Sequence, residues 1–142
     1  MKTTALAALM AALLTPACVH ATSVEAARLT LTFETGAATG AVMVSLFDSK
    51  AAYTDGAPVR QARVDVAGGD RTVIFSDLPA GIYGVKAFHD VNGDGRMNTN
   101  PFGVPTEPFA FSNNARGNMG PAEWDRAHVT IKGATTQTIK FH

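Results

Sequence analysis

The chain contains little cysteine, little tryptophan and no excess charge of either sign. Its single cysteine, Cys18, lies near the N-terminus and leaves no partner for an intramolecular disulfide. The 12 basic residues are balanced by 12 acidic ones, so the basic patch typical of nucleic-acid binding is missing. Without further cysteine, and with four scattered histidines, a transition-metal site is not supported. The composition excludes a disulfide scaffold and gives no reason to expect a nucleic-acid partner.

Residues 1–21 have the pattern of a secretory signal peptide. Lys2 provides the N-terminal charge, and 5–14 is an uncharged apolar run too short to span a bilayer. Residues 19–21 carry the small or apolar side chains that signal peptidase reads. We therefore predict a secreted or periplasmic protein with a mature chain of 22–142, no transmembrane segment and one domain. Lipidation at Cys18, after small residues at 15–17, is the less favoured route.

The mature chain reads as short strands separated by turn residues. Residues 48–61 are polar and predict an exposed loop, and 121–127 could form a helical turn or two. Residues 98–125 lack periodicity but carry many aromatic side chains, which indicates one long ordered loop. The pattern predicts an all-β fold, an antiparallel β-sandwich of about seven strands. The predicted strands cover 28–34, 41–47, 62–66, 71–75, 82–89, 127–132 and 135–141.

One stretch fits the opening of a calcium loop with oxygen ligands. Acidic and amide side chains alternate before Gly95, so their oxygens can converge as the loop tightens. An EF-hand would need Glu where the chain has Pro101, so any bidentate closure must come from Glu107 or from another loop. The predicted ligands are Asp90, Asn92, Asp94, the Arg96 carbonyl, Asn98 and Glu107. Asn-Gly and Asp-Gly are also strong hairpin-turn signals, and a bare turn without metal is the alternative.

A second hypothesis is a site for carbohydrate or another small ligand in the aromatic stretch 109–124. Aromatic rings could stack on a ligand while amide and guanidinium groups donate hydrogen bonds. The ordinary alternative is core packing for the rings and hydrogen bonding to the loop backbone for the asparagines. The candidates are His89, Phe111, Asn113, Asn114, Arg116 and Trp124.

Catalysis is the third hypothesis. His89 and Asp90, with Ser112 and Glu107 in the same motif-rich region, resemble the parts of a catalytic triad. Adjacent residues of a strand point to opposite faces, however, and no nucleophile elbow, zinc motif or phosphate loop accompanies them. We therefore predict that the protein is not an enzyme.

Four motifs carry a resemblance to known families. The Leu-Pro-Ala-Gly turn and strand at 78–85 is similar to those of prealbumin-like and collagen-adhesin B-type sandwiches. Together with the motifs at 89–95, 103–108 and 111–114, it resembles an uncharacterised family of secreted bacterial proteins, domain of unknown function 2141, over about 28–141. The resemblance implies an immunoglobulin-like or prealbumin-like sandwich and an exported location, but no biochemical activity.

The adhesin repeats also carry an Asp-x-Asn-x-Asp-Gly calcium motif followed by a later Glu, although the spacing is longer here. The leading hypothesis is thus an exported, monomeric, non-enzymatic domain with a structural calcium ion. Such a domain would bind an envelope or extracellular partner or support an envelope structure.

Overall fold

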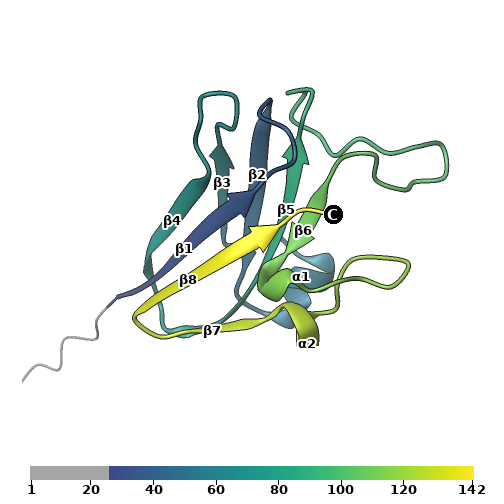
Figure 1. Cartoon of the computed structure of the whole chain (residues 1–142). Coiled ribbons are helices and arrows are strands. Elements are labelled where there is room, and N and C mark those ends of the chain that lie inside the picture. The colour runs from purple at the N-terminus through teal and green to yellow at the C-terminus, as the bar shows by residue number, and fades with distance from the viewer. Residues whose placement is uncertain (1–25) are drawn as a thin grey trace, which may run out of the picture.

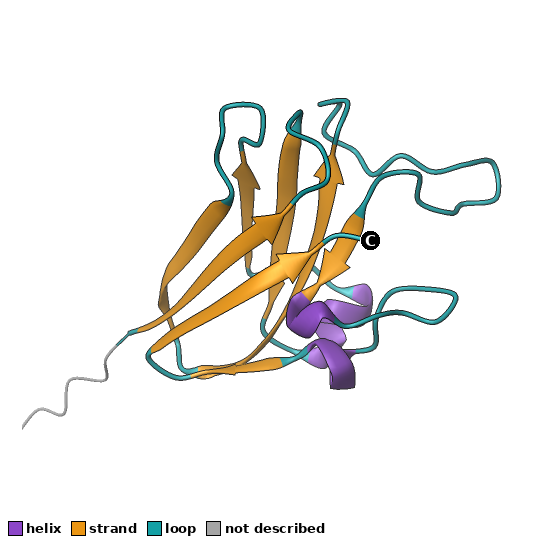
Figure 2. Cartoon of the chain, in the orientation of Figure 1, coloured by secondary structure: helices purple, strands orange, loops and turns teal. Residues whose placement is uncertain are grey.

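Two β-sheets pack face to face in the computed structural model, which describes residues 26–142 (Figures 1 and 2). The first sheet has the order β4 (Thr72–Leu78), β1 (Ala27–Glu34) and β8 (Ala134–Lys140). The second has the order β3 (Arg60–Val64), β2 (Ala41–Phe47), β5 (Gly81–Asp90) and β6 (Phe109–Phe111), and β7 (Val129–Ile131) also pairs with β5. The predicted sandwich is confirmed. The predicted signal peptide and Cys18 lie outside the described residues.

The main core lies between the two sheets and follows from the alternation in the sequence. In β1, Leu29, Leu31 and Phe33 all point inward and are buried, while the residues between them are not. They meet the inward residues of β2 and β5, so a strand period of two places one apolar face of each sheet against the other. The strand β2 lies between β3 and β5, the central position that its continuous apolar run predicts.

Every pair of neighbouring strands in residues 26–142 is antiparallel, with one exception. Strands β1 and β8 are parallel, with Arg28 opposite Ala134 and Glu34 opposite Lys140. The chain reaches β8 through β7, at the end of the sandwich where β1 begins, so the two strands run in the same direction (Figure 1). Local periodicity contains no information about this long-range pairing.

Three short helices group at one end of the molecule, beside the second sheet (Figure 2). The helix α1 (Lys50–Asp55) lies inside the predicted loop 48–61, where the Ser49 hydroxyl accepts a hydrogen bond from the Ala52 amide at 3.3 Å. The turn η1 (Ser112–Asn114) follows β6, and α2 (Trp124–Ala127) falls inside the segment 121–127 that predicts a helical turn. None of the described helices has both the length and the hydrophobicity needed to cross a membrane.

The outer face of the second sheet carries a smaller apolar cluster. Tyr53 of α1 packs edge-on against Phe47 and against Trp124 of α2, with 5.5 Å between ring centroids in both pairs. These rings lie over Gly84 of β5, where a Cβ atom would be 2.9 Å from both Trp124 and Tyr53. Because Gly84 has no side chain, the two rings can pack directly on the strand at this position.

The free edge of β5 is shared between two short strands. β7 pairs with Gly81–Tyr83 and β6 pairs with Lys86–Phe88. Between them, the buried Ser112 hydroxyl accepts a hydrogen bond from the Val85 amide at 2.8 Å and donates one to the Ala127 carbonyl. A side chain thus completes the hydrogen bonding of the edge where no strand does.

Replacing Gly84 by alanine should destabilise the fold by about 1–3 kcal/mol, because the added methyl group overpacks the site beneath Tyr53 and Trp124. Urea unfolding measures the change. Gly36→Ala is the matched control, since nothing lies within 4 Å of its Cβ position, and it should stay within about 0.5 kcal/mol of the parent. Equal losses in the two variants would contradict the packing argument.

Candidate functional site

The loop of residues 90–107 starts at the last residue of β5, where the Asp90 side chain is only 1% exposed. Its Oδ1 accepts hydrogen bonds from the amides of Gly93 at 2.8 Å and Asp94 at 3.1 Å, and its Oδ2 accepts one from Gly95 at 2.8 Å. Gly40, in the turn before β2, packs so closely on Asp90 that a Cβ atom would lie 1.9 Å from the Asp90 carbonyl oxygen. The first predicted ligand is therefore fixed by the sheet and by its own loop.

Asn92 and Asp94 repeat the same local pattern along the loop. The Asn92 Oδ1 accepts the amide of Asp94 at 3.0 Å, and the Asp94 Oδ1 accepts the amide of Arg96 at 2.9 Å. Each side chain thus bonds the backbone two residues ahead, which is the Asx turn that Asp and Asn favour. Gly93 and Gly95 have φ angles of +78° and +79°, conformations that glycine adopts without steric cost.

The side-chain amides of Asn92 and Asn98 surround the remaining oxygen of Asp94. Asn98 Nδ2 donates to Asp94 Oδ2 at 2.9 Å, and Asn92 Nδ2 donates to the same oxygen at 3.3 Å and to Asn98 Oδ1 at 3.0 Å. Backbone groups do not take part in these three contacts. Among the described residues, the Asn98 side chain bonds no backbone group, whereas the Asn92 amide also accepts the Asp94 N–H through its Oδ1.

Glu107 closes the loop from its far end. Its side chain is 8% exposed, and its two oxygens accept the amides of Val91 at 2.9 Å and Asn98 at 3.1 Å. The structure therefore brings the predicted ligands Asp90, Asn92, Asp94, Asn98 and Glu107 into one hydrogen-bonded network, and Arg96 joins it through its backbone. Glu107 thus reaches the loop, where both of its oxygens bond backbone amides, and its role as a metal ligand stays a prediction.

The donor set of this network matches a hard cation better than a transition metal. Its side chains offer carboxylate and amide oxygens, which are ligands that Ca²⁺ takes in proteins. Arg96 takes part through its N–H, and its carbonyl remains a ligand predicted from the sequence alone. Within residues 26–142, no three Asp, Glu, His or Cys side chains form a group that could hold a metal by themselves. Amide and carbonyl oxygens would have to complete the coordination, which requires the Asn92 and Asn98 amides to turn their oxygens toward Asp94.

Hydrogen bonding also sets the acidity of Asp94. The Asn98 amide, and after it the Arg96 backbone amide, lower the pKa of Asp94 below its ordinary value of 3.8, although the side chain is exposed. The carboxylate is therefore ionised at any physiological pH. An ionised oxygen ligand in the middle of the network favours a bound cation.

The side chain of Asn100, which the sequence analysis did not single out, orders the tip of the loop. Asn100 Oδ1 accepts the amides of Phe102 at 2.9 Å and Val104 at 3.0 Å, and Thr99 bridges to Pro105. The signal that could have identified it is the Asn-Pro pair, which favours turn initiation. The tip is therefore an ordered hairpin that projects from the sandwich (Figure 1).

The structure does not gather the candidates of the ligand-binding hypothesis into one site. His89 is fully buried, with Nε2 2.7 Å from the Thr39 carbonyl oxygen. Asn113 donates to the His128 carbonyl at 2.7 Å and Asn114 to the Thr138 carbonyl at 3.0 Å, so both bond the backbone. Hydrogen bonding to the backbone is the alternative that the sequence analysis gave for these two asparagines. Arg116 lies exposed near the C-terminus, and Phe111 is buried beside the second sheet.

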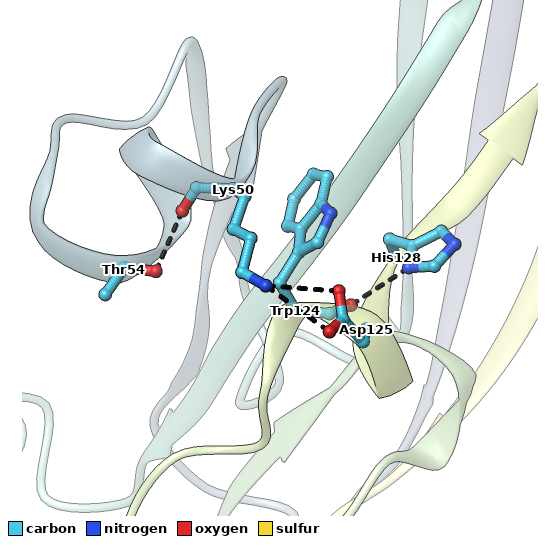
Figure 3. Close-up of polar contacts among 5 residues, drawn as sticks. All are labelled: Lys50, Thr54, Trp124, Asp125 and His128. Carbon is cyan, nitrogen blue, oxygen red and sulfur yellow. Dashed lines mark hydrogen bonds and ion pairs between the residues drawn. The ribbon is translucent and has the colours of Figure 1, made fainter.

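Trp124 is half-buried in the cluster around α2. Its ring stacks on His128 with 5.8 Å between centroids, and the His128 Nδ1 lies 3.1 Å from the Trp124 carbonyl oxygen (Figure 3). The exposed ion pair Lys50–Asp125, at 3.3 Å, links α1 and α2 beside it. Trp124 therefore packs two helices together. Phe111, another candidate, belongs to the same apolar cluster, where its ring is buried.

The four residues of the triad hypothesis each have other partners. The Ser112 hydroxyl bonds Val85 and Ala127, and His89 bonds Thr39. The carboxylates of Asp90 and Glu107 accept backbone amides. The described hydrogen bonds join no two of these four side chains. The expectation of a protein without catalytic activity remains a prediction.

Comparison with known proteins identifies the family. A family model described as "Uncharacterized protein conserved in bacteria (DUF2141)" matches residues 34–140. The chain belongs to this DUF2141 family. No curated protein and no solved structure matches the chain. The family resemblance drawn from the motifs is thus confirmed.

The part matched by DUF2141 runs from the last residue of β1 to the last residue of β8. It includes β5, the whole 90–107 loop and β6, so the hydrogen-bonded network belongs to the family domain. The description of DUF2141 names no activity, and function must be inferred from the geometry.

Replacing Asn98 by alanine should raise the pKa of Asp94 toward 3.8, because the largest contribution to its lowering is lost. A lowered carboxyl pKa stabilises the fold above the unfolded-state pKa, and this contribution disappears as the pH falls through the folded-state value. NMR titration of the Asp94 carboxyl group measures the shift. Asn100→Ala removes an amide from the same loop without touching Asp94 and should leave the midpoint unchanged. Identical midpoints in all three proteins would refute the assignment.

Proposed function

We propose that the protein is an exported, non-enzymatic β-sandwich module whose 90–107 loop binds a structural calcium ion. The observation that carries the proposal is the single network of carboxylate and amide side chains between the end of β5 and Glu107. Ordering a loop of this length costs about 1–2 kcal/mol of backbone entropy per fixed residue. A cation with several oxygen ligands offsets part of that cost.

Asp94 is the ligand that we expect to bind the ion first. Its Oδ2 is partnered by two side-chain amides, whereas both oxygens of Asp90 and of Glu107 bond backbone amides. Rotation of Asn92 and Asn98 would replace amide hydrogens by amide oxygens around the same point. Turning the Asn98 amide breaks no bond to the backbone, whereas turning the Asn92 amide gives up its bond from the Asp94 N–H.

A weak site is sufficient for this role. Extracellular calcium modules have dissociation constants of about 10⁻⁴–10⁻³ M. At about 10 mM Ca²⁺ such a site stabilises the folded state by roughly 1.4–2.7 kcal/mol. The ion would thus strengthen an exported domain that has no disulfide, and would not act as a signal.

Calcium binding should give a measurable heat, and calcium should raise the melting temperature of the purified protein by several degrees relative to EDTA. Asp94→Asn, which removes a charge from an exposed side chain, should abolish both effects. Asp70→Asn removes an equivalent exposed charge from the β3–β4 turn and should bind like the parent. Calorimetry and thermal melts measure these effects. Equal melting temperatures in calcium and EDTA, together with no heat of binding, would show that the motif is only a turn.

Export is tested by the mass of the protein recovered from outside the cytoplasm. Cleavage after Ala21 should give a chain that begins at Thr22. A mass that begins at Cys18 and carries lipid would indicate a membrane-anchored form instead. Recovery of the uncleaved chain only from the cytoplasm would contradict export.

A further inference from the structure

A groove of about 910 Å³ lies on the outer face of the second sheet, bordered by the 90–107 loop and by residues 115–123. The two bordering segments project from the same side of the sandwich (Figure 1). Its volume is in the range of sites that enclose a small-molecule ligand, about 300–1,000 Å³. We call it the outer groove.

The floor of the outer groove consists of two rows of side chains across the sheet. Met43 of β2 pairs with Phe88 of β5, which pairs with Phe109 of β6, and Ser45 pairs in the same way with Lys86 and Phe111. Residues paired across strands lie on the same face. The outer face of a sheet is commonly polar, so an apolar floor of this kind calls for a covering partner.

The walls of the outer groove carry the most exposed of the large apolar side chains in the described residues. Phe102 is 90% exposed, Val104 55% and Met119 105%, and these three are the most exposed of the large apolar residues. Met97 and Met43 also line the groove. Methionine side chains are flexible and polarizable, so they adapt to apolar ligands of different shapes.

Lys86 is the one charged residue among those lining the outer groove. Its ammonium group lies 4.4 Å from the ring centroid of Tyr53 and 5.2 Å from that of Phe47, and it donates a hydrogen bond to the Tyr53 carbonyl. The two ion pairs of the described residues, Lys50–Asp125 and Lys140–Glu34, involve other lysines. Burial lowers the pKa of Lys86, against an opposite effect of Asp55. An ammonium has three donors, so an anion can still be bound.

We propose that the outer groove binds a soluble amphiphile with one anionic head group, of the class of a fatty acid. The carboxylate would lie at Lys86, and the chain would run over Phe88 and Phe109 between the Phe102 and Met119 walls. Lys86 is the one charge among lining residues that are mostly apolar, and the acidic residue that acts on it, Asp55, is not among them, which is complementary to this class. A concave face does not complement its own copy, and a single lysine lacks the basic cluster by which proteins bind anionic membranes. The inference does not depend on bound calcium.

The proposal is tested by competition with the fluorescent probe anilinonaphthalene sulfonate. All measurements are made in EDTA, so that calcium plays no part. Dodecanoate should displace the probe at about tenfold lower concentration than the uncharged dodecanol, since a hydrogen bond to a charged group is lost with the alcohol. Lys86→Gln should remove this tenfold preference. Lys132→Gln removes an exposed lysine in the β7–β8 turn and should preserve it.

The apolar wall is tested with a second pair of variants. Phe102→Ser should weaken both competitors several-fold, and folding should be unaffected because the ring is almost fully exposed. Ile74→Ser, an exposed apolar residue of the first sheet, should bind like the parent. Thermal melts confirm that the variants are folded.

Three outcomes would overturn the proposal. The first is equal displacement by dodecanoate and dodecanol in the parent protein. The second is a Phe102→Ser variant that binds like Ile74→Ser. The third is binding to phosphatidylglycerol vesicles, or self-association by sedimentation that is lost in Phe102→Ser, without binding of free dodecanoate. These would indicate a membrane surface or a second copy as the occupant. Because calcium is absent throughout, failure here leaves the calcium proposal untouched.

Discussion

Strand β5 has partners on its inner face and along both edges, and this constraint organises the rest of the molecule. Its inward residues, among them Val85 and Ala87, belong to the core between the sheets. Its outward face is covered by Tyr53 and Trp124 at Gly84, and farther along it forms the floor of the outer groove. One edge pairs with β2 over Gly84–Asp90, while the other is shared by β7, the Ser112 hydroxyl and β6. A strand with so many partners is a rigid support for the loop that begins at its end.

The periodicity of the sequence predicts the strands because each buries one alternating face. The predicted span 41–47 coincides with β2, and 28–34 differs from β1 by one residue. The helix α1 escapes prediction because its buried contact comes from one residue, Tyr53, which leaves no apolar stripe. β6 is too short to show alternation, and its existence depends on pairing with the distant β5. The parallel β8 likewise depends on contacts far apart in sequence.

The same distinction between local patterns and contacts far apart in sequence explains how much of the site could be predicted. The network from Asp90 to Asn98 is local, so its spacing in the sequence already implies convergent oxygens. Glu107 was expected to close the loop, but only the fold shows that it does so by accepting backbone amides. Asn113 and Asn114 suggest ligand donors in the sequence, yet the His128 carbonyl after α2 and backbone groups of β8 occupy them. The outer groove depends on strand register, because Met43, Phe88 and Phe109 become neighbours only when three strands align.

The 90–107 loop has two surfaces with different chemistry. Its polar side chains converge on a network centred on the exposed Asp94, while Met97, Phe102 and Val104 line the outer groove. Met97 directly precedes Asn98, whose backbone amide is bound by Glu107, so the bonds that order the polar side also position the apolar wall. Because both surfaces belong to one backbone segment, a single loss of conformational entropy on ordering the loop forms both of them. Whatever orders the network therefore lowers the cost of shaping the groove. Conversely, a ligand held in the groove favours the backbone conformation in which the oxygens of the network converge.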